Sequence, residues 1–266
     1  MIDTHIHARI GWTKRSVSES LRACTFERAL LAAAPIDHWG TELNEGCARI
    51  IRQFPNRLTG LVGIHPPDLN RSLRDIEKYG RLGFAGIKLM PTTGYYPDDD
   101  RFRPVFEEVN ARRWMVLTHC GLCSPGTKRP DLPQSTRFSD PYHIEPLARV
   151  FTRTDFILAH GGGSTFFAHA AEMTRYLRNV YIDTCPGNGH WVLRNGGPWI
   201  EVLDWSRVLF GTDAILGDVR EDRAYGEKVE AIALILRDIG RSGRLETVMK
   251  ENAVKLLRRH GIPAAV

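Results

Sequence analysis

The segment Asp3-Thr4-His5-Ile6-His7 opens the chain with two histidines two residues apart. In a β-strand, residues i and i+2 lie on the same face, so the segment predicts two imidazoles side by side. Two neighbouring imidazoles can bind one divalent metal ion and leave room for further ligands. A histidine-bearing strand without metal is the alternative interpretation, and the residues further along the chain bear on the choice.

Apolar runs of strand length alternate with helical patterns from this segment to the end of the chain. We predict eight strands, at residues 2–8, 26–34, 58–65, 84–90, 114–119, 155–160, 180–184 and 208–213. We predict helices at residues 41–54, 72–79, 104–113, 144–152, 165–177, 222–239 and 245–260, with Thr41 as the N-cap of the first. The second strand is rich in alanine, so a helix is the alternative there.

This alternation predicts parallel strands with helices outside them. The strands are apolar on both faces, as expected for strands that are covered on both sides. With 266 residues, the prediction is an α/β fold of the (β/α)8 TIM-barrel type, in one domain over residues 1–266. A doubly wound open sheet is the alternative, but no glycine-rich phosphate loop follows the first strand.

Four segments are predicted to be loops that set substrate specificity: 9–20, 92–103, 122–141 and 186–199. The third is too long for a simple connector, so we expect it to cover a site. The fourth is irregular and carries two of the six tryptophans.

Composition narrows the class of protein. The net charge of +5 comes from scattered residues, which supports a small anionic substrate and no nucleic-acid partner. The longest nearly apolar run, 29–36, is too short to span a membrane, and no signal peptide is visible. Five cysteines without framework spacing fit a reducing, cytoplasmic location. The CxxC of Cys120 and Cys123 is interpreted as two ordinary thiols.

Polar residues recur at one place, near the carboxyl ends of predicted strands: His5 and His7, Lys88, His119, His160 and Asp213. A barrel brings these ends to one face, where active sites lie. Burying such groups together is costly unless they are paired or bound to metal. The nitrogen and oxygen donors among them suit zinc, with manganese or iron as the alternative.

These motifs together resemble the metal-dependent amidohydrolase superfamily, in the branch with amidohydrolase-related hydrolases, lactonases and decarboxylases. The resemblance runs from Asp3 to about Leu257. It rests on the first histidine pair, Gly86-Ile87-Lys88-Leu89, Gly94-Tyr95, Thr118-His119-Cys120-Gly121, Ala159-His160-Gly161-Gly162, Leu209-Phe210-Gly211-Thr212-Asp213 and Asn252-Ala253. Met90 departs from it, because many relatives carry a histidine there, and this leaves the substrate open.

The resemblance implies that His5, His7, His119 and Asp213 bind the metal. Asp213 would also accept a proton from the metal's water, and His160 would be a catalytic acid or base, or a ligand of a second metal.

Two roles are open for Lys88, because the superfamily includes centres with one metal ion and centres with two. We favour one metal ion with Lys88 in contact with substrate; the alternative is a carboxylated Lys88 that bridges two ions. Arg9 and Tyr95 are predicted to bind substrate, Arg9 as a clamp for a carboxylate. His65 is interpreted as structural, His190 as a substrate contact above the barrel, and the histidines 38, 143, 169 and 260 as solvent-facing.

Three functions follow as hypotheses. The first is a metal-dependent hydrolase of a small amide, lactone or carboxylated cyclic substrate, which uses metal-activated water. The second is a non-oxidative decarboxylase on the same metal site. The third is a non-catalytic barrel that serves as a binding protein. The sequence leaves a homodimer open.

Overall fold

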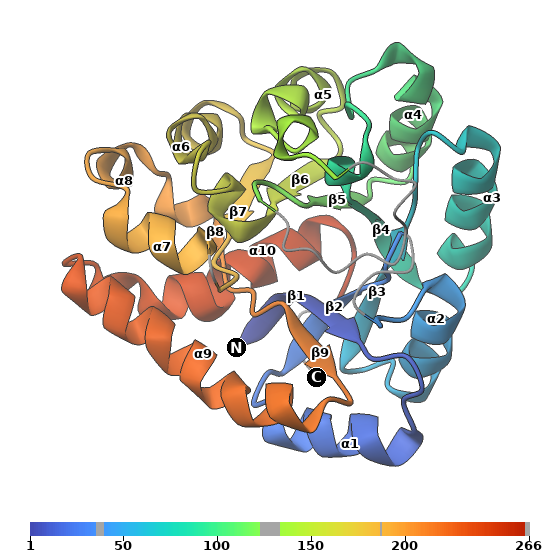
Figure 1. Cartoon of the computed structure of the whole chain (residues 1–266), viewed down its shortest axis with the longest axis horizontal. Helices are drawn as coiled ribbons and strands as arrows, with labels where there is room; N and C mark the ends of the chain where they lie inside the picture. Colours follow the sequence, from blue (N-terminus) through green and yellow to red (C-terminus); the bar gives the residue numbers. More distant parts are fainter. Residues whose placement is uncertain (36–39, 123–133, 187, 264–266) are drawn as a thin grey trace.

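A strongly curled parallel sheet forms the centre of the structure, a computed structural model that describes residues 1–35, 40–122, 134–186 and 188–263 (Figure 1). Every pair of neighbouring strands is parallel. The strands are β1 (Ile2–Ala8), β2 (Arg28–Ala32), β3 (Leu58–Gly63), β4 (Phe84–Leu89), β5 (Met115–Thr118), β6 (Asp155–Leu158), β7 (Val180–Asp183), β8 (Val208–Leu209) and β9 (Ala214–Leu216). The alanine-rich second segment is therefore a strand and not a helix.

The sheet closes on itself through the segment that holds β8 and β9. The strand order runs from β8 through β7 to β1 and ends at β9, so both ends belong to residues 208–216. The first half bonds to β7, where Thr184 N donates to Leu209 O at 3.0 Å. The second half bonds to β1, where Asp213 N donates to His5 O at 2.8 Å. The predicted (β/α)8 barrel is confirmed, and its eighth strand is split around 210–213.

Helices surround the sheet (Figure 1). They are α1 (Lys14–Ala23), α2 (Asn44–Gln53), α3 (Leu69–Gly80), α4 (Arg103–Ala111), α5 (Glu145–Val150), α6 (Phe167–Tyr176), α7 (Asn188–Asn195), α8 (Trp199–Val202), α9 (Val219–Asp238) and α10 (Asn252–Arg259), the last preceded by a π-helical turn (Thr247–Glu251). Among the helices of the described residues, none is both long and apolar enough to cross a membrane.

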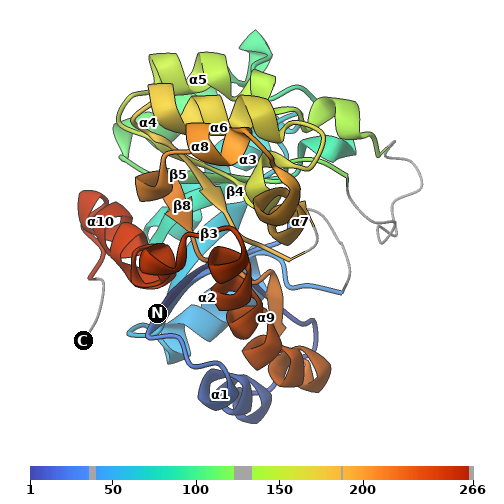
Figure 2. The same ribbon diagram turned by 90° about the vertical axis from the view of Figure 1, so that its left-hand side faces the viewer.

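The helix α10 covers the amino-terminal end of the barrel, at the left in Figure 2. Its Leu256 and Leu257 pack in one buried cluster with inward-facing strand residues such as Leu30, Leu117 and Ile157. Asn252, at the start of the helix, donates to the carbonyl of Val208 at 2.8 Å. With this end filled by apolar side chains, the polar strand residues are left to the carboxyl end.

Two of the predicted loops contain α-helical segments of a full turn or more, which is a correction. Segment 9–20 includes most of α1, whose N-cap Thr13 exchanges hydrogen bonds with Ser16 and whose Val17 and Leu21 are buried. The four-residue spacing of these two apolar residues was the sequence signal, obscured by the surrounding basic residues. Segment 186–199 contains α7 and the start of α8, with Val192 and Leu193 buried.

Other boundaries also differ from the prediction. Helix α2 begins at Asn44 with Leu43 as its N-cap, so Thr41 is not the cap; it pairs instead with Arg9 in an isolated bridge. Most of the predicted loop 122–141 lies outside the described residues, as do Cys123 and His38.

Candidate metal centre

The side chains of His5, His7 and Asp213 converge where β1 meets the split eighth strand. The Nε2 atoms of His5 and His7 lie 3.4 Å and 3.2 Å from Oδ1 of Asp213. Both histidines project from the same face of β1, as their two-residue spacing predicts. Asp213 adopts a left-handed backbone, with φ of 54°, at the break between β8 and β9. Because residues with side chains rarely adopt this conformation, the break is a special feature that aims the carboxylate at β1.

Hydrogen bonds behind the two imidazoles decide which nitrogen of each ring is free. Nδ1 of His5 lies 2.9 Å from Oδ2 of Asp183, and Nδ1 of His7 lies 2.8 Å from the carbonyl of Ala32. Both partners are acceptors, and each lies closer to Nδ1 than Asp213 lies to Nε2, so each Nδ1 carries the proton and each Nε2 keeps its lone pair. Two free imidazole nitrogens and a carboxylate oxygen within 4.8 Å of one another form a donor set that fits a divalent metal ion.

The charges of this cluster also suit a metal. Burial, followed by the nearby charge of Lys88, lowers the pKa of His5 to about 4. Burial alone would raise the pKa of Asp213, but the facing imidazoles of His5 and His7 outweigh it and hold this pKa well below its usual value. At neutral pH the site therefore presents a neutral imidazole and a carboxylate, the protonation states in which these groups bind metals.

His119 and His160 lie next to the cluster. His119 follows β5, and its buried Nε2 has no hydrogen-bond partner among the described residues. Its ring centroid lies 4.8 Å from that of His160, which lies 5.6 Å from that of His5. An unpaired buried nitrogen is unfavourable by about 1–3 kcal/mol, and a metal ion would supply the missing partner. The donor atoms of His5, His7 and Asp213 lie within 4.8 Å of one another, and His119 lies outside this group.

The backbone after β6 turns sharply to present His160. His160 has φ of 58°, and the three glycines after it have φ of 66°, 81° and 84°. Side chains at the glycine positions would be strained, because L-residues avoid this region. Oδ1 of Asp183 accepts from the backbone N of His160 at 2.7 Å and holds this turn.

Lys88 projects from β4 into the same cluster. Its Nζ lies 3.0 Å from Nε2 of His5 and is buried. Burial lowers the pKa of Lys88. Nζ of Lys88 donates to the lone pair of His5 that a metal would use.

The two residues predicted to bind substrate occupy different surroundings. Arg9 directly follows β1, has an exposed side chain, and lies 3.5 Å from Asp218. Tyr95 is buried; its hydroxyl accepts from the N of Met90 at 3.1 Å and its ring packs against His65. The structure therefore places Arg9 at the rim of the carboxyl end of the barrel, whereas Tyr95 is packed among buried side chains. The roles of both residues in substrate binding stay predictions.

His190 and three of the histidines expected to face solvent, His143, His169 and His260, have partners or burial of their own; Nε2 of His169 lies 3.5 Å from Glu145. Burial lowers the pKa of His190, on α7, to about 4. The prediction for His260 is wrong, because its side chain is 2% exposed and its Nε2 lies 2.8 Å from Asp155. His143 is part-buried and lies 2.8 Å from Asp98.

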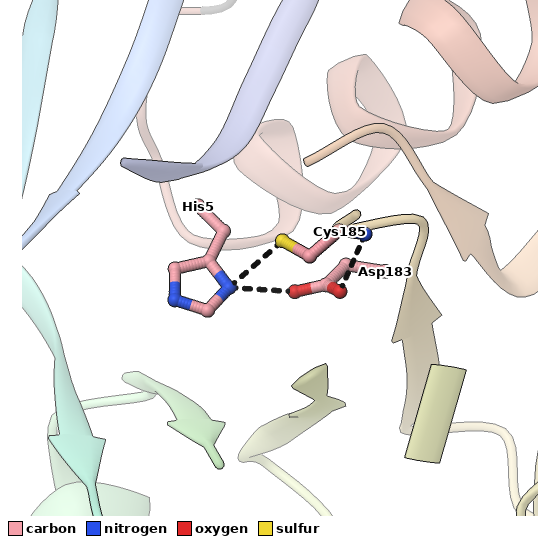
Figure 3. Close-up of side chains that lie close together, drawn as sticks. All are labelled: His5, Asp183 and Cys185. Carbon is pink, nitrogen blue, oxygen red and sulfur yellow. Dashed lines mark hydrogen bonds and ion pairs between the residues drawn. The ribbon is translucent and has the colours of Figure 1, made fainter. Parts of the chain in front are cut away.

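Sequence analysis missed Asp183 and Cys185. Asp183 is the last residue of β7, and Cys185 Sγ lies 3.1 Å from Nδ1 of His5, as Figure 3 shows. Its position in the sequence could have identified Asp183, because it ends a predicted strand as the other site residues do. The predicted strand 180–184 was nevertheless given no site residue.

Comparisons with known proteins identify the family and the fold of this chain. The family model described as amidohydrolase (Amidohydro_2) matches residues 2–259. A search of curated proteins found no match.

Solved structures with the same fold cover nearly the whole chain. An uncharacterised TIM-barrel protein from Bordetella bronchiseptica has 15% identity and a TM-score of 0.70, over 98% of this chain and 100% of that one. A structure described as a probable 2-pyrone-4,6-dicarboxylic acid hydrolase from Acinetobacter baumannii, with citric acid bound, has 16% identity and a TM-score of 0.65, over 97% and 98%.

A third structure is the 5-carboxyvanillate decarboxylase of Novosphingobium aromaticivorans, complexed with manganese and a nitrobenzoic acid. It has 19% identity and a TM-score of 0.60, over 92% of this chain and 80% of that one. These likenesses establish a shared barrel fold, and the family match covers nearly all of the sequence. The chain belongs to the amidohydrolase family.

Proposed function

We propose that the protein is a metal-dependent hydrolase of a small amide, lactone or carboxylated cyclic substrate. The observation that carries the proposal is the convergence of two imidazole Nε2 atoms on one carboxylate, with each Nδ1 proton held by an acceptor. This arrangement presents three ligand atoms together at the end of the barrel where active sites occur.

The metal would be held by His5, His7 and Asp213. His119 would complete the set through its Nε2, which has no partner in the described part of the chain. When bound, a divalent ion lowers the pKa of a coordinated water from about 15.7 to about 7, which makes hydroxide available at neutral pH. We propose zinc, because imidazole nitrogens dominate the set, with manganese as the alternative, and one ion per chain.

Asp213 is the proposed proton acceptor. Its carboxylate is 40% exposed, so it can be reached from the open end of the barrel, and its lowered pKa keeps it charged. His160, whose ring faces both His5 and His119, would hold the substrate carbonyl or donate a proton to the leaving group.

Two basic residues would recognise an anionic substrate. Lys88 reaches the metal centre from β4, and Arg9 lies at the rim of the barrel. Lys88 would bind a substrate carboxylate close to the metal, and Arg9 would bind one at the rim. Tyr95 would line the substrate site beside them. Two of the similar structures carry names of carboxylated ring compounds, a pyrone dicarboxylic acid and carboxyvanillate, which supports a substrate of this type.

Decarboxylation is the second candidate, because one similar structure is a decarboxylase with manganese. A buried lysine beside the metal cluster could hold the carboxylate that leaves. The test is a screen of lactones, cyclic amides and aromatic acids with protein whose metal content has been measured. Ring opening supports the hydrolase, and release of carbon dioxide supports the decarboxylase. If neither reaction occurs and the protein binds no metal after metal is added, the results support a non-catalytic binding barrel.

We further propose a single-domain cytoplasmic enzyme with no nucleic-acid or membrane partner, and we leave a homodimer open. The four cysteines among the described residues are all free, which supports a reducing compartment: Cys24, Cys47, Cys120 and Cys185. Size-exclusion chromatography with light scattering tests the dimer.

A further inference from the structure

We infer that Asp183 is a positioning residue that holds His5 in the tautomer needed for metal binding and holds His160 beside it. The inference deepens the proposed function and rests on it where metal is concerned. Asp183 ends β7 and is buried, so it can act only through neighbouring groups.

One carboxylate connects the two histidines. Oδ2 of Asp183 accepts from Nδ1 of His5 at 2.9 Å, and Oδ1 accepts from the backbone N of His160 at 2.7 Å. Oδ1 also accepts from the N of Cys185 at 3.1 Å (Figure 3). The two oxygens therefore have separate partners: one faces an imidazole, and the other faces two backbone amides.

The surroundings hold this arrangement closely. A Cβ added at Gly211 would lie 3.0 Å from Cys185 Sγ, 3.2 Å from His5 Cβ and 3.3 Å from Asp183 Cβ. A larger residue at position 211 would therefore press on all three side chains. Glycine at this position lets the eighth strand approach the three side chains.

His5, Asp183 and Cys185 could also be considered as a metal site of their own, since their donor atoms lie within 4.8 Å of one another. The distances from Nδ1 to Oδ2 and Sγ are 2.9 Å and 3.1 Å. Ligands of a tetrahedral zinc lie about 3.3 Å or more apart, given bonds of about 2.0–2.3 Å. The contact of 2.9 Å is clearly shorter, whereas Asp213 lies 3.4 Å and 3.2 Å from His5 and His7, close to the spacing of metal ligands. The observed contacts are those of hydrogen bonds, so we assign positioning and not a second metal.

The separate partners of the two oxygens make Asp183→Asn a sharp test. The amide oxygen of asparagine would stay with the two backbone N–H groups, because an NH2 group there would face two other donors. The NH2 group would then face Nδ1 of His5 and donate to it. This favours the opposite tautomer, in which Nε2 carries the proton and has no lone pair for the metal. Oδ1 of Asp213, 3.4 Å away, would accept this proton, and the contact of Nε2 with Lys88 would be lost.

The experiment measures the His5 tautomer in metal-free protein by long-range proton–nitrogen NMR, assigned with His5→Gln. We expect Nδ1–H in the wild type and Nε2–H in Asp183→Asn. Zn²⁺ titration against a competing chelator should show about 10- to 100-fold weaker binding in the variant, the usual effect of losing a partner of a metal-binding histidine.

Asp3→Asn is the matched control, because Asp3 is also buried and accepts a hydrogen bond from the backbone N of His5 at 3.1 Å. Within the described residues, Asp3 makes no hydrogen bond to the His5 ring. Asp3→Asn should keep the Nδ1–H tautomer, as should Cys185→Ala. If His5 carries its proton on Nε2 in the wild type, the inference is overturned, even if Asp183→Asn does not fold. If Asp183→Asn folds and binds Zn²⁺ as tightly as the wild type, the inference is overturned as well. Wild-type protein that binds no Zn²⁺ would instead remove the proposed function and leave the tautomer result to stand by itself.

Discussion

Replacing Lys88 with methionine tests how the buried lysine and the metal share His5. Nζ of Lys88 donates to Nε2 of His5 at 3.0 Å, the same lone pair that the metal is proposed to use. Metal binding must therefore break this hydrogen bond and free the ammonium for a substrate carboxylate. Methionine has similar length and no charge, so Lys88→Met removes the competitor with little change in volume.

The expected magnitude follows from that contact. A hydrogen bond from a charged group contributes about 1.5–3 kcal/mol, so its removal should strengthen Zn²⁺ binding by roughly 10- to 100-fold. Repulsion between the ammonium and a bound cation adds in the same direction. The same substitution removes a charged contact with the substrate, so KM for an anionic substrate should rise by a similar factor.

The assay is chelator-competition titration with Zn²⁺, together with steady-state kinetics on the substrate identified by screening. Protein prepared with bicarbonate is included, and Lys255→Met, at an exposed position on α10, is the control that should change neither quantity. Two ions per chain in the wild type, with both lost in Lys88→Met, would refute the reasoning and show a carboxylated lysine that bridges two metals.

Three further predictions concern His5 and His7, His160 and Asp3. His5→Ala or His7→Ala should abolish activity and lower metal content together, measured by elemental analysis; full occupancy in both would contradict the ligand assignment. His160→Asn should keep the metal but reduce turnover by about 10²- to 10⁴-fold, whereas the loss of one ion per chain would make His160 a ligand of a second ion. Burial raises the pKa of Asp3 from 3.8 to about 7, despite hydrogen bonds from Thr212 and Tyr225. The pKa of Asp3 is higher in the folded than in the unfolded state, so the contribution of this group to the free energy of unfolding is fully present below pH 3.8 and is lost as pH rises through 7. Asp3→Asn should therefore remove up to about 4 kcal/mol of pH dependence from the free energy of unfolding, measured in urea. Parallel stability curves for the two proteins from pH 4 to 8 would show that Asp3 does not titrate in this way.

The barrel could be predicted because its information is local. Alternating apolar runs and helical patterns identify strands and helices one at a time, and polar residues at strand ends, such as His119 and His160, stand out from the apolar runs before them. The errors lie where the local signal is weak or mixed. Basic residues obscured α1, and the glycines and prolines of segment 186–199 hid α7 and α8.

The sequence by itself determined the barrel, the pair of histidines on β1 and the strand-end residues that meet at one face. It did so because period-two and period-3.6 patterns are set within a few residues of chain. Only the tertiary structure decided which groups touch. Asp183 faces the imidazole of His5 from 178 positions away, and Lys88 reaches the same ring from β4. Such contacts depend on how β1, β4 and β7 are brought together when the sheet closes, and no local pattern encodes a distance between strands.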